Sequence, residues 1–118
     1  MSVNFYAFGP FPGGDTAGEG LHIGQHASVH RFLFRAHPAM GLTSRAAWAE
    51  FIRRPDVSIK AEHGRDISVE EMEETWNRRT DVKDWPLKSR FGIRRGSDLR
   101  SGEFVDSEGY ELYAGEFC

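Results

Sequence analysis

Residues 42–61 read LTSRAAWAEFIRRPDVSIKA, and this stretch decides the fold class because a helix pattern is followed directly by a strand pattern. Apolar residues recur at helical spacing in its first half, namely Leu42, Ala47, Trp48, Phe51 and Ile52. Thr43 or Ser44 can cap this helix, and Pro55 ends it. Apolar and polar residues then alternate as in a half-buried strand, with Val57, Ile59 and Ala61 on the apolar side. We therefore expect an α+β protein.

Upstream of this stretch, the sequence predicts a β-hairpin. Residues 21–23 and 29–36 have strand character and flank a connection of mostly small residues at 24–28. In the second strand, alternate residues are expected to face the core, a set made of His30, Phe32, Phe34 and Ala36. The preceding residues 1–20 mix aromatic side chains with frequent glycine and proline. That mixture predicts an irregular N-terminal loop anchored to the core by its aromatic residues.

Downstream, a turn at 62–65 leads into a second helix and a closing hairpin. Ser68 and Glu71 fit a capping box, in which the serine and the glutamate each accept a backbone hydrogen bond at the start of a helix. Apolar residues follow at helical spacing, namely Val69, Met72 and Trp76. The closing hairpin is expected over 104–105 and 110–114, around a turn at 106–109.

The length of the chain fits one domain. With 118 residues and 13.4 kDa it has room for one hydrophobic core, and no internal repeat or linker divides it. A hydrophobic fraction of 39% argues against a disordered chain. We expect a single α+β domain over residues 1–118. In it a small antiparallel sheet of about five strands in hairpins packs with two amphipathic helices.

The charge and the cysteine content narrow the functional classes. Lysine and arginine number 15 against 18 aspartates and glutamates, and the resulting net charge of −3 is too small for a DNA mimic. It also has the wrong sign for a uniformly basic nucleic-acid module. The opening residues lack the features of a signal peptide, and no window approaches the ~20 apolar residues of a membrane span. The single cysteine, Cys118, cannot form an internal disulfide, so we expect a cytoplasmic protein with no membrane association.

The loop-rich segment 78–100 is the main candidate for binding. It carries eight basic and three acidic side chains, interleaved with Trp85 and Phe91. Arginine and aromatic residues anchor protein interfaces, and the same combination can attract phosphate and stack on bases. A solvated loop would have the same composition. The candidate partner-binding residues are Trp85, Lys88, Arg90, Phe91, Arg94 and Arg95, with His26 and His30 as a second surface.

No motif predicts catalysis or a cofactor. His22, His26 and His30 are spaced four apart, which would align ligands on a helix but has no such meaning in the predicted hairpin. Ser28 and Cys118 lie in no activating motif. We therefore expect no catalytic residue, no metal and no cofactor. A small metal-dependent enzyme that uses His22, His26 and His63 is the less favoured alternative.

Several short motifs resemble those of small proteins from tailed phages and prophages. They are Gly20-Leu21-His22-Ile23-Gly24, Phe32-Leu33-Phe34, Leu42-Thr43-Ser44 with Trp48, residues 62–68, Gly109-Tyr110-Glu111-Leu112 and Ala114-Gly115-Glu116-Phe117. The resemblance spans about residues 20–117. In that group a lysine and a tryptophan follow the His-Ile-Gly motif, where this chain has Gln25 and His30. The resemblance implies a phage origin and a similar fold, and it transfers no catalytic residue.

A phage origin without a catalytic constellation favours a protein that occupies a surface of a host protein or of a protein–nucleic acid complex. We expect a phage-encoded inhibitor or modulator that binds its target stoichiometrically, as anti-defence proteins of the anti-CRISPR type do. The alternative partner is nucleic acid, bound through segment 78–100 by an accessory protein.

Overall fold

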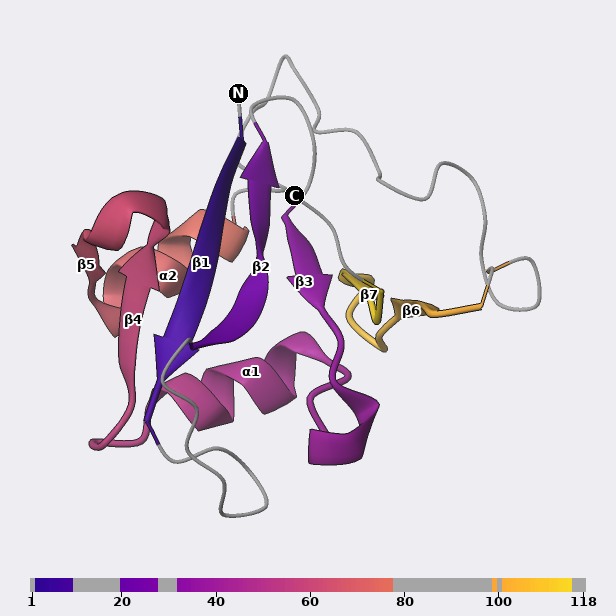
Figure 1. The fold of residues 1–118 in the computed structure, drawn as a ribbon. Coiled ribbons are helices and arrows are strands. Elements are labelled where there is room, and N and C mark those ends of the chain that lie inside the picture. The colour runs from indigo at the N-terminus through magenta and orange to yellow at the C-terminus, as the bar shows by residue number, and fades with distance from the viewer. Residues whose placement is uncertain (1, 10–19, 28–31, 78–98, 100, 116–118) are drawn as a thin grey trace.

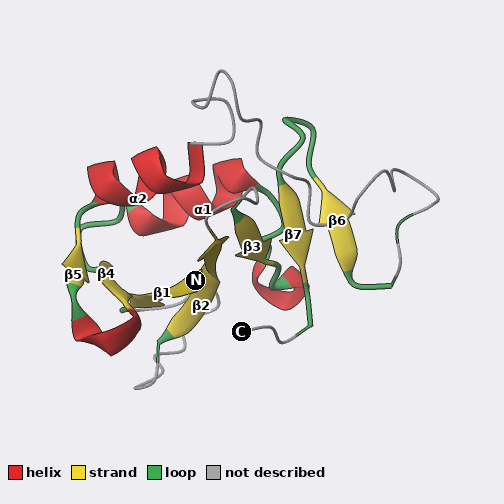
Figure 2. Cartoon of the chain, turned by 90° about the horizontal axis from the view of Figure 1, so that it is seen from above, coloured by secondary structure: helices red, strands yellow, loops and turns green. Residues whose placement is uncertain are grey.

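A seven-stranded sheet and two helices form the two layers of the structure, which is a computed structural model and describes residues 2–9, 20–27, 32–77, 99 and 101–115 (Figure 1). The strands are β1 (Ser2–Phe8), β2 (Leu21–Ala27), β3 (Leu33–Arg35), β4 (Ser58–Ala61), β5 (Asp66–Ile67), β6 (Glu103–Val105) and β7 (Glu111–Tyr113). The helices are α1 (Arg45–Ile52) and α2 (Val69–Asn77), with short 3-10 turns η1 (Pro38–Met40) and η2 (Glu62–Gly64). Both helices lie on the same side of the sheet (Figure 2). The expected α+β class is confirmed.

The sheet is larger than expected and mixed rather than antiparallel. Its strand order is β5-β4-β1-β2-β3-β7-β6. β3 and β7 run parallel, with Phe34 opposite Leu112, while all the other neighbouring pairs are antiparallel. The prediction of about five antiparallel strands was wrong for two reasons. It missed β1 and β5, and it had no local signal for the parallel pairing of two segments far apart in sequence.

The N-terminal residues form a strand where an irregular loop was expected. Residues 2–8 form β1, which pairs with β2 on one side and with β4 on the other. Phe5 and Ala7 point into the core and are 5% and 0% exposed. Pairing on both edges satisfies the backbone of this segment, so tertiary context decides its structure. The glycine-rich and proline-rich residues 10–19 lie outside the described residues.

The second strand extends into the residues where the hairpin turn was expected. β2 and β3 do pair antiparallel as predicted, but residues 24–27 continue β2 instead of forming the turn. A β-bulge shifts the register here, since Phe5 pairs with Gly24 and Tyr6 pairs with His22, which leaves Ile23 between the two pairs. A side chain at Gly24 would clash with the Leu33 carbonyl oxygen and the Phe32 ring. Glycine is therefore required for the close approach of β2 and β3.

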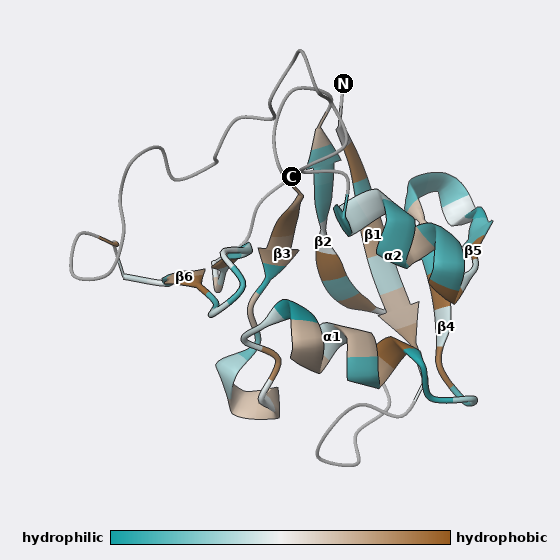
Figure 3. Cartoon of the chain, turned by 180° about the vertical axis from the view of Figure 1, so that it is seen from behind, coloured by the Kyte–Doolittle hydropathy of each residue, from teal (hydrophilic) through white to brown (hydrophobic). Residues whose placement is uncertain are grey.

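The core between the sheet and the helices matches the predicted apolar residues. Phe34, Trp48, Ile52, Met72, Trp76 and Leu112 are all 0% exposed. Both helix caps are confirmed: the Ser44 hydroxyl accepts a hydrogen bond from the Ala47 amide at 3.1 Å, and the Ser68 hydroxyl accepts one from the Glu71 amide at 3.0 Å. Viewed from behind, α2 is mostly hydrophilic, whereas α1 consists largely of apolar residues (Figure 3).

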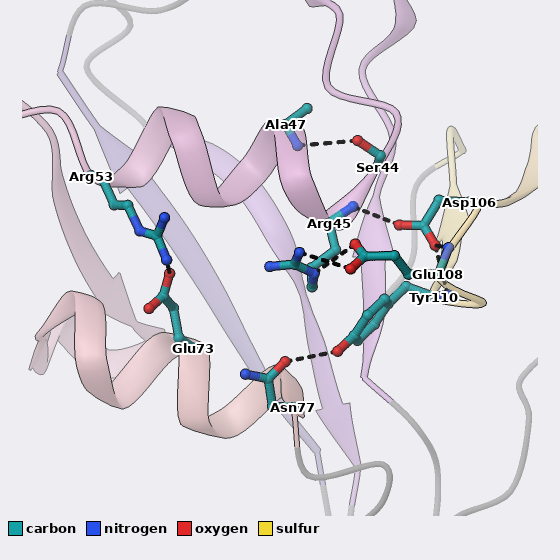
Figure 4. Close-up of polar contacts among 9 residues, drawn as sticks. All are labelled: Ser44, Arg45, Ala47, Arg53, Glu73, Asn77, Asp106, Glu108 and Tyr110. Carbon is teal, nitrogen blue, oxygen red and sulfur yellow. Dashed lines mark hydrogen bonds and ion pairs between the residues drawn. The ribbon is translucent and has the colours of Figure 1, made fainter.

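The predicted closing hairpin, β6 and β7, is tied to both helices by polar contacts (Figure 4). The Asp106 carboxylate accepts a hydrogen bond from the Arg45 amide at 2.8 Å, at the start of α1. The Arg45 guanidinium donates to both carboxylate oxygens of Glu108, at 2.9 and 3.0 Å. The Tyr110 hydroxyl donates to the Asn77 side chain at 2.7 Å. These contacts fix the hairpin to the first residue of α1 and the last residue of α2.

Candidate interaction surface

One face of the sheet is covered by neither α1 nor α2, and we call it the helix-free face (Figure 2). Residues that pair directly across strands share a face, so the pairs of the sheet define which side chains lie there. Tyr6 pairs with both His22 and Lys60, Asn4 with Gln25, and Arg35 with Tyr113. The helix-free face therefore consists of Asn4, Tyr6, His22, Gln25, Leu33, Arg35, Lys60, Glu111 and Tyr113. Apart from Leu33 it is polar and aromatic, in contrast to the apolar face beneath the helices. Its partly exposed residues are Tyr6, His22, Arg35, Lys60 and Tyr113, whereas Asn4, Gln25, Leu33 and Glu111 are buried.

His22 lies at the centre of a hydrogen-bonded chain on this face. The Asn4 side-chain amide donates to the Glu62 carboxylate at 2.9 Å, and the Asn4 backbone amide donates to the same oxygen at 2.6 Å. This orientation directs the Asn4 carbonyl oxygen toward Nε2 of His22, 2.8 Å away. Because an amide oxygen only accepts, Nε2 of His22 carries the proton. The chain Glu62, Asn4, His22 thus joins η2, β1 and β2.

The environment of His22 favours its neutral form. Burial, together with the nearby positive charges of Arg35 and His37, lowers the pKa of His22 from 6.5 to about 4. Burial also lowers the pKa of His37, whose Nε2 donates to the His22 carbonyl oxygen at 3.0 Å. The two hydrogen bonds from Asn4 lower the pKa of Glu62, which stays ionised at neutral pH. The face therefore holds a fixed carboxylate beside uncharged imidazoles.

Aromatic and cationic side chains surround the hydrogen-bonded series Glu62, Asn4 and His22. The Tyr6 ring stacks on the His22 ring, with centroids 5.2 Å apart and planes 29° apart. Nε of Arg35 donates to the Ala114 carbonyl oxygen at 3.2 Å, next to Tyr113. Lys60 forms an ion pair of 2.8 Å with Asp66. These side chains are held by partners within the chain, so their orientations are fixed in the free protein.

The structure describes only one of the predicted partner-binding residues, His26. Trp85, Lys88, Arg90, Phe91, Arg94, Arg95 and His30 lie outside the described residues. His26 is half-buried on β2 and pairs with Val3, so it faces the helix side of the sheet. Regular alternation would have placed His22 and His26 on one face, but the bulge at Ile23 puts them on opposite faces.

The side chains of His22, His26 and His63 do not converge on a metal site. His22 and His26 lie on opposite faces, and His63 is exposed in η2. The described ranges of the chain contain no group of three or more histidine, cysteine, aspartate or glutamate side chains that could hold an ion. The arrangement that the alternative enzyme requires is therefore not formed by His22, His26 and His63. Ser28 and Cys118 lie outside the described residues.

Sequence reasoning missed Asn4, Tyr6 and Glu62. A signal for the first two exists, because residues 4–8 read NFYAF and alternate between the two faces of β1. The surrounding glycines and prolines outweighed it. Glu62 gives no local signal, since its role depends on contact with Asn4, 58 residues earlier.

Comparisons with protein-family models, with curated proteins and with solved structures find no match. In the part of the chain that the structure describes, there is no helix of the length and apolarity needed to span a membrane.

Proposed function

We propose that this chain is a phage-encoded inhibitor or modulator that works in the host cytoplasm by binding a host protein stoichiometrically, in the manner of anti-CRISPR proteins. The proposed contact surface is the partly exposed part of the helix-free face, made of Tyr6, His22, Arg35, Lys60 and Tyr113. The observation that carries the proposal is the preorganised group of Tyr6, His22 and Arg35 on that face. Tyrosine and arginine are enriched among the residues that contribute most to protein–protein binding.

Rigidity supports this use of the face. The Asn4 bonds fix His22, and the stacked His22 ring in turn restricts Tyr6. Side chains that are already ordered lose little conformational entropy on association, which favours binding. Segment 78–100 adds arginine and aromatic side chains by sequence, and we assign it to the same partner.

Titration of a captured partner tests the proposal. Immobilised protein is incubated with bacterial host lysate, and the retained partner is identified, purified and titrated by calorimetry. We expect saturation at a fixed stoichiometric ratio. Tyr6→Ala should weaken binding by about tenfold, the loss of one anchor. Glu70→Ala, an exposed change on α2, is the matched control and should leave affinity unchanged.

Three results would count against the proposal. A partner that binds equally well to Tyr6→Ala, with an unchanged melting temperature, would remove the helix-free face. Nuclease-sensitive capture whose affinity falls steeply with salt, and which Arg94→Glu with Arg95→Glu abolishes, would establish nucleic-acid binding instead. Substrate turnover at substoichiometric amounts of protein would establish an enzyme.

A further inference from the structure

A small pocket lies in the helix layer, between η1 and α1. It has a volume of about 180 Å³. Met40, Leu42, Ala47 and Phe51 form its apolar walls, Glu50 and Arg54 lie at its rim, and polar and apolar groups contribute about equally to its lining. Leu42 and Phe51 are 3% and 2% exposed, so they form a fixed floor that belongs to the core.

The size of the pocket limits what it can hold. Cavities that bind drug-sized molecules have volumes of about 300–1,000 Å³. A volume of about 180 Å³ is instead suited to one large apolar side chain. Pockets of this kind receive the anchor residues of protein partners, because a single buried side chain can supply much of the binding energy.

The charges on the rim indicate what flanks that side chain. The other described arginine and lysine side chains each donate to a carboxylate or carbonyl oxygen of the protein. The guanidinium of Arg54 instead lies over the Phe51 ring, 5.6 Å from its centroid, and within the described ranges it has no carboxylate partner. Glu50 likewise forms no ion pair there. Both side chains are exposed and can pair with charges of opposite sign on a ligand.

From these observations we propose that the pocket binds a polypeptide segment with a large apolar side chain flanked by one acidic and one basic residue. The apolar side chain packs against Met40, Leu42 and Ala47. Its acidic neighbour pairs with Arg54 and its basic neighbour pairs with Glu50. This site is separate from the helix-free face, so it is a second point of contact with a protein.

Methyl NMR with short peptides tests this site directly. The protein is labelled with ¹³C at the methionine methyl groups, and the Met40 signal is assigned with Met40→Leu. The probes are Ac-Glu-Leu-Lys-NH₂, Ac-Lys-Leu-Glu-NH₂ and Ac-Glu-Ala-Lys-NH₂. We expect one of the two leucine peptides to shift the Met40 signal saturably, with a Kd of about 1 mM. The alanine peptide should bind about tenfold more weakly, because it buries less apolar area.

Two variants make the test specific. Ala47→Leu fills the pocket from α1 and should abolish the shift, while Arg54→Glu should weaken the preferred peptide by about threefold or more. Tyr6→Ala should leave the titration unchanged, so failure of this inference is distinguishable from failure of the proposed function. The inference is overturned if Met40 does not respond to either leucine peptide, or if the response is the same with the alanine peptide or in Ala47→Leu.

Discussion

His22 illustrates how a single position sets the chemistry of its side chain. The same residue type is exposed at His63 and half-buried at His37, but only His22 is linked through Asn4 to a carboxylate and stacked under a tyrosine. The hydrogen bond with the Gly24 backbone and the negative charge of Glu62 favour the protonated form and raise the pKa of His22. Burial and two neighbouring positive charges outweigh them, so the neutral form is the one that the fold selects.

The stability of the protein should therefore depend on pH through His22. The unfolded chain takes up a proton near pH 6.5, whereas the folded chain takes it up only near pH 4, so protonation favours unfolding between these values. This contribution is fully present above pH 6.5 and is lost as the pH falls toward 4. We expect a loss of about 2 kcal/mol in the free energy of unfolding, after allowing for solvent screening. Urea unfolding at intervals of half a pH unit measures it.

His22→Gln is the control for this titration. Glutamine keeps an N–H donor for the Asn4 oxygen but does not titrate, so the pH dependence between 4 and 6.5 should become shallower. A remaining slope is expected from His37, whose pKa is also lowered. An identical slope in wild type and His22→Gln would show that His22 is not the group responsible.

At the scale of elements, the β6–β7 turn serves as a cap for α1. Asp106 accepts hydrogen bonds from the backbone amides of Arg45, Glu108 and Tyr110, at 2.8, 3.0 and 2.9 Å. One carboxylate therefore orders the turn and satisfies an amide at the start of the helix. Its negative charge also lies at the end of α1 where the helix dipole is positive.

Asp106→Ala should lower the free energy of unfolding by about 2–3 kcal/mol, because three backbone donors lose their acceptor together. Guanidinium chloride denaturation measures the change. Asp106→Asn retains one oxygen and should cost less. Glu108→Ala removes a largely exposed ion pair with Arg45 and should cost under about 1 kcal/mol. Equal losses for Asp106→Ala and Glu108→Ala would mean that the cap contributes nothing beyond the ion pair.

The elements also show what could be predicted from sequence. Both helices were predictable because their signals are local: a serine cap, apolar spacing, and Pro55 after α1. β4 and the closing hairpin were predictable from alternation and a turn. β1 and the parallel pairing of β3 with β7 were not, because each is stabilised by partners distant in sequence. β5 pairs with the nearby β4, but its two residues are too few to show a strand pattern. The bulge at Ile23 could not be predicted either. It places His22 and His26 on opposite faces of the sheet, whereas regular alternation predicts one face.

For the whole molecule, the strand order places two short strands at the edges of the sheet. β5 has two residues and β6 has three, and these are the edge strands of the sheet. Very short edge strands offer little backbone for pairing with another chain, which opposes aggregation. The longest strands, β1 and β2, are neighbours in the interior of the sheet.

Because one hydrophobic core joins the sheet and the helices, a destabilising substitution in β7 should lower the stability of the whole molecule. Leu112→Ala removes a side chain that is 0% exposed and should cost about 2–5 kcal/mol. Tryptophan fluorescence and far-UV circular dichroism should shift to the same lower denaturant midpoint, as in a two-state transition. Val3→Ala, at a position 36% exposed, is the control and should cost under about 1 kcal/mol. Separate midpoints for the two probes in Leu112→Ala would show that the β7 region unfolds independently.

The parallel pairing of β3 with β7 has a consequence for biosynthesis. β3 is translated some 80 residues before its second neighbour, so a ribosome adding about 5–20 residues per second exposes that edge for several seconds. During this interval Phe34 and Trp76 lack their core neighbours Leu112 and Tyr110. We therefore expect chaperones to bind the nascent chain until its last strand has left the exit tunnel.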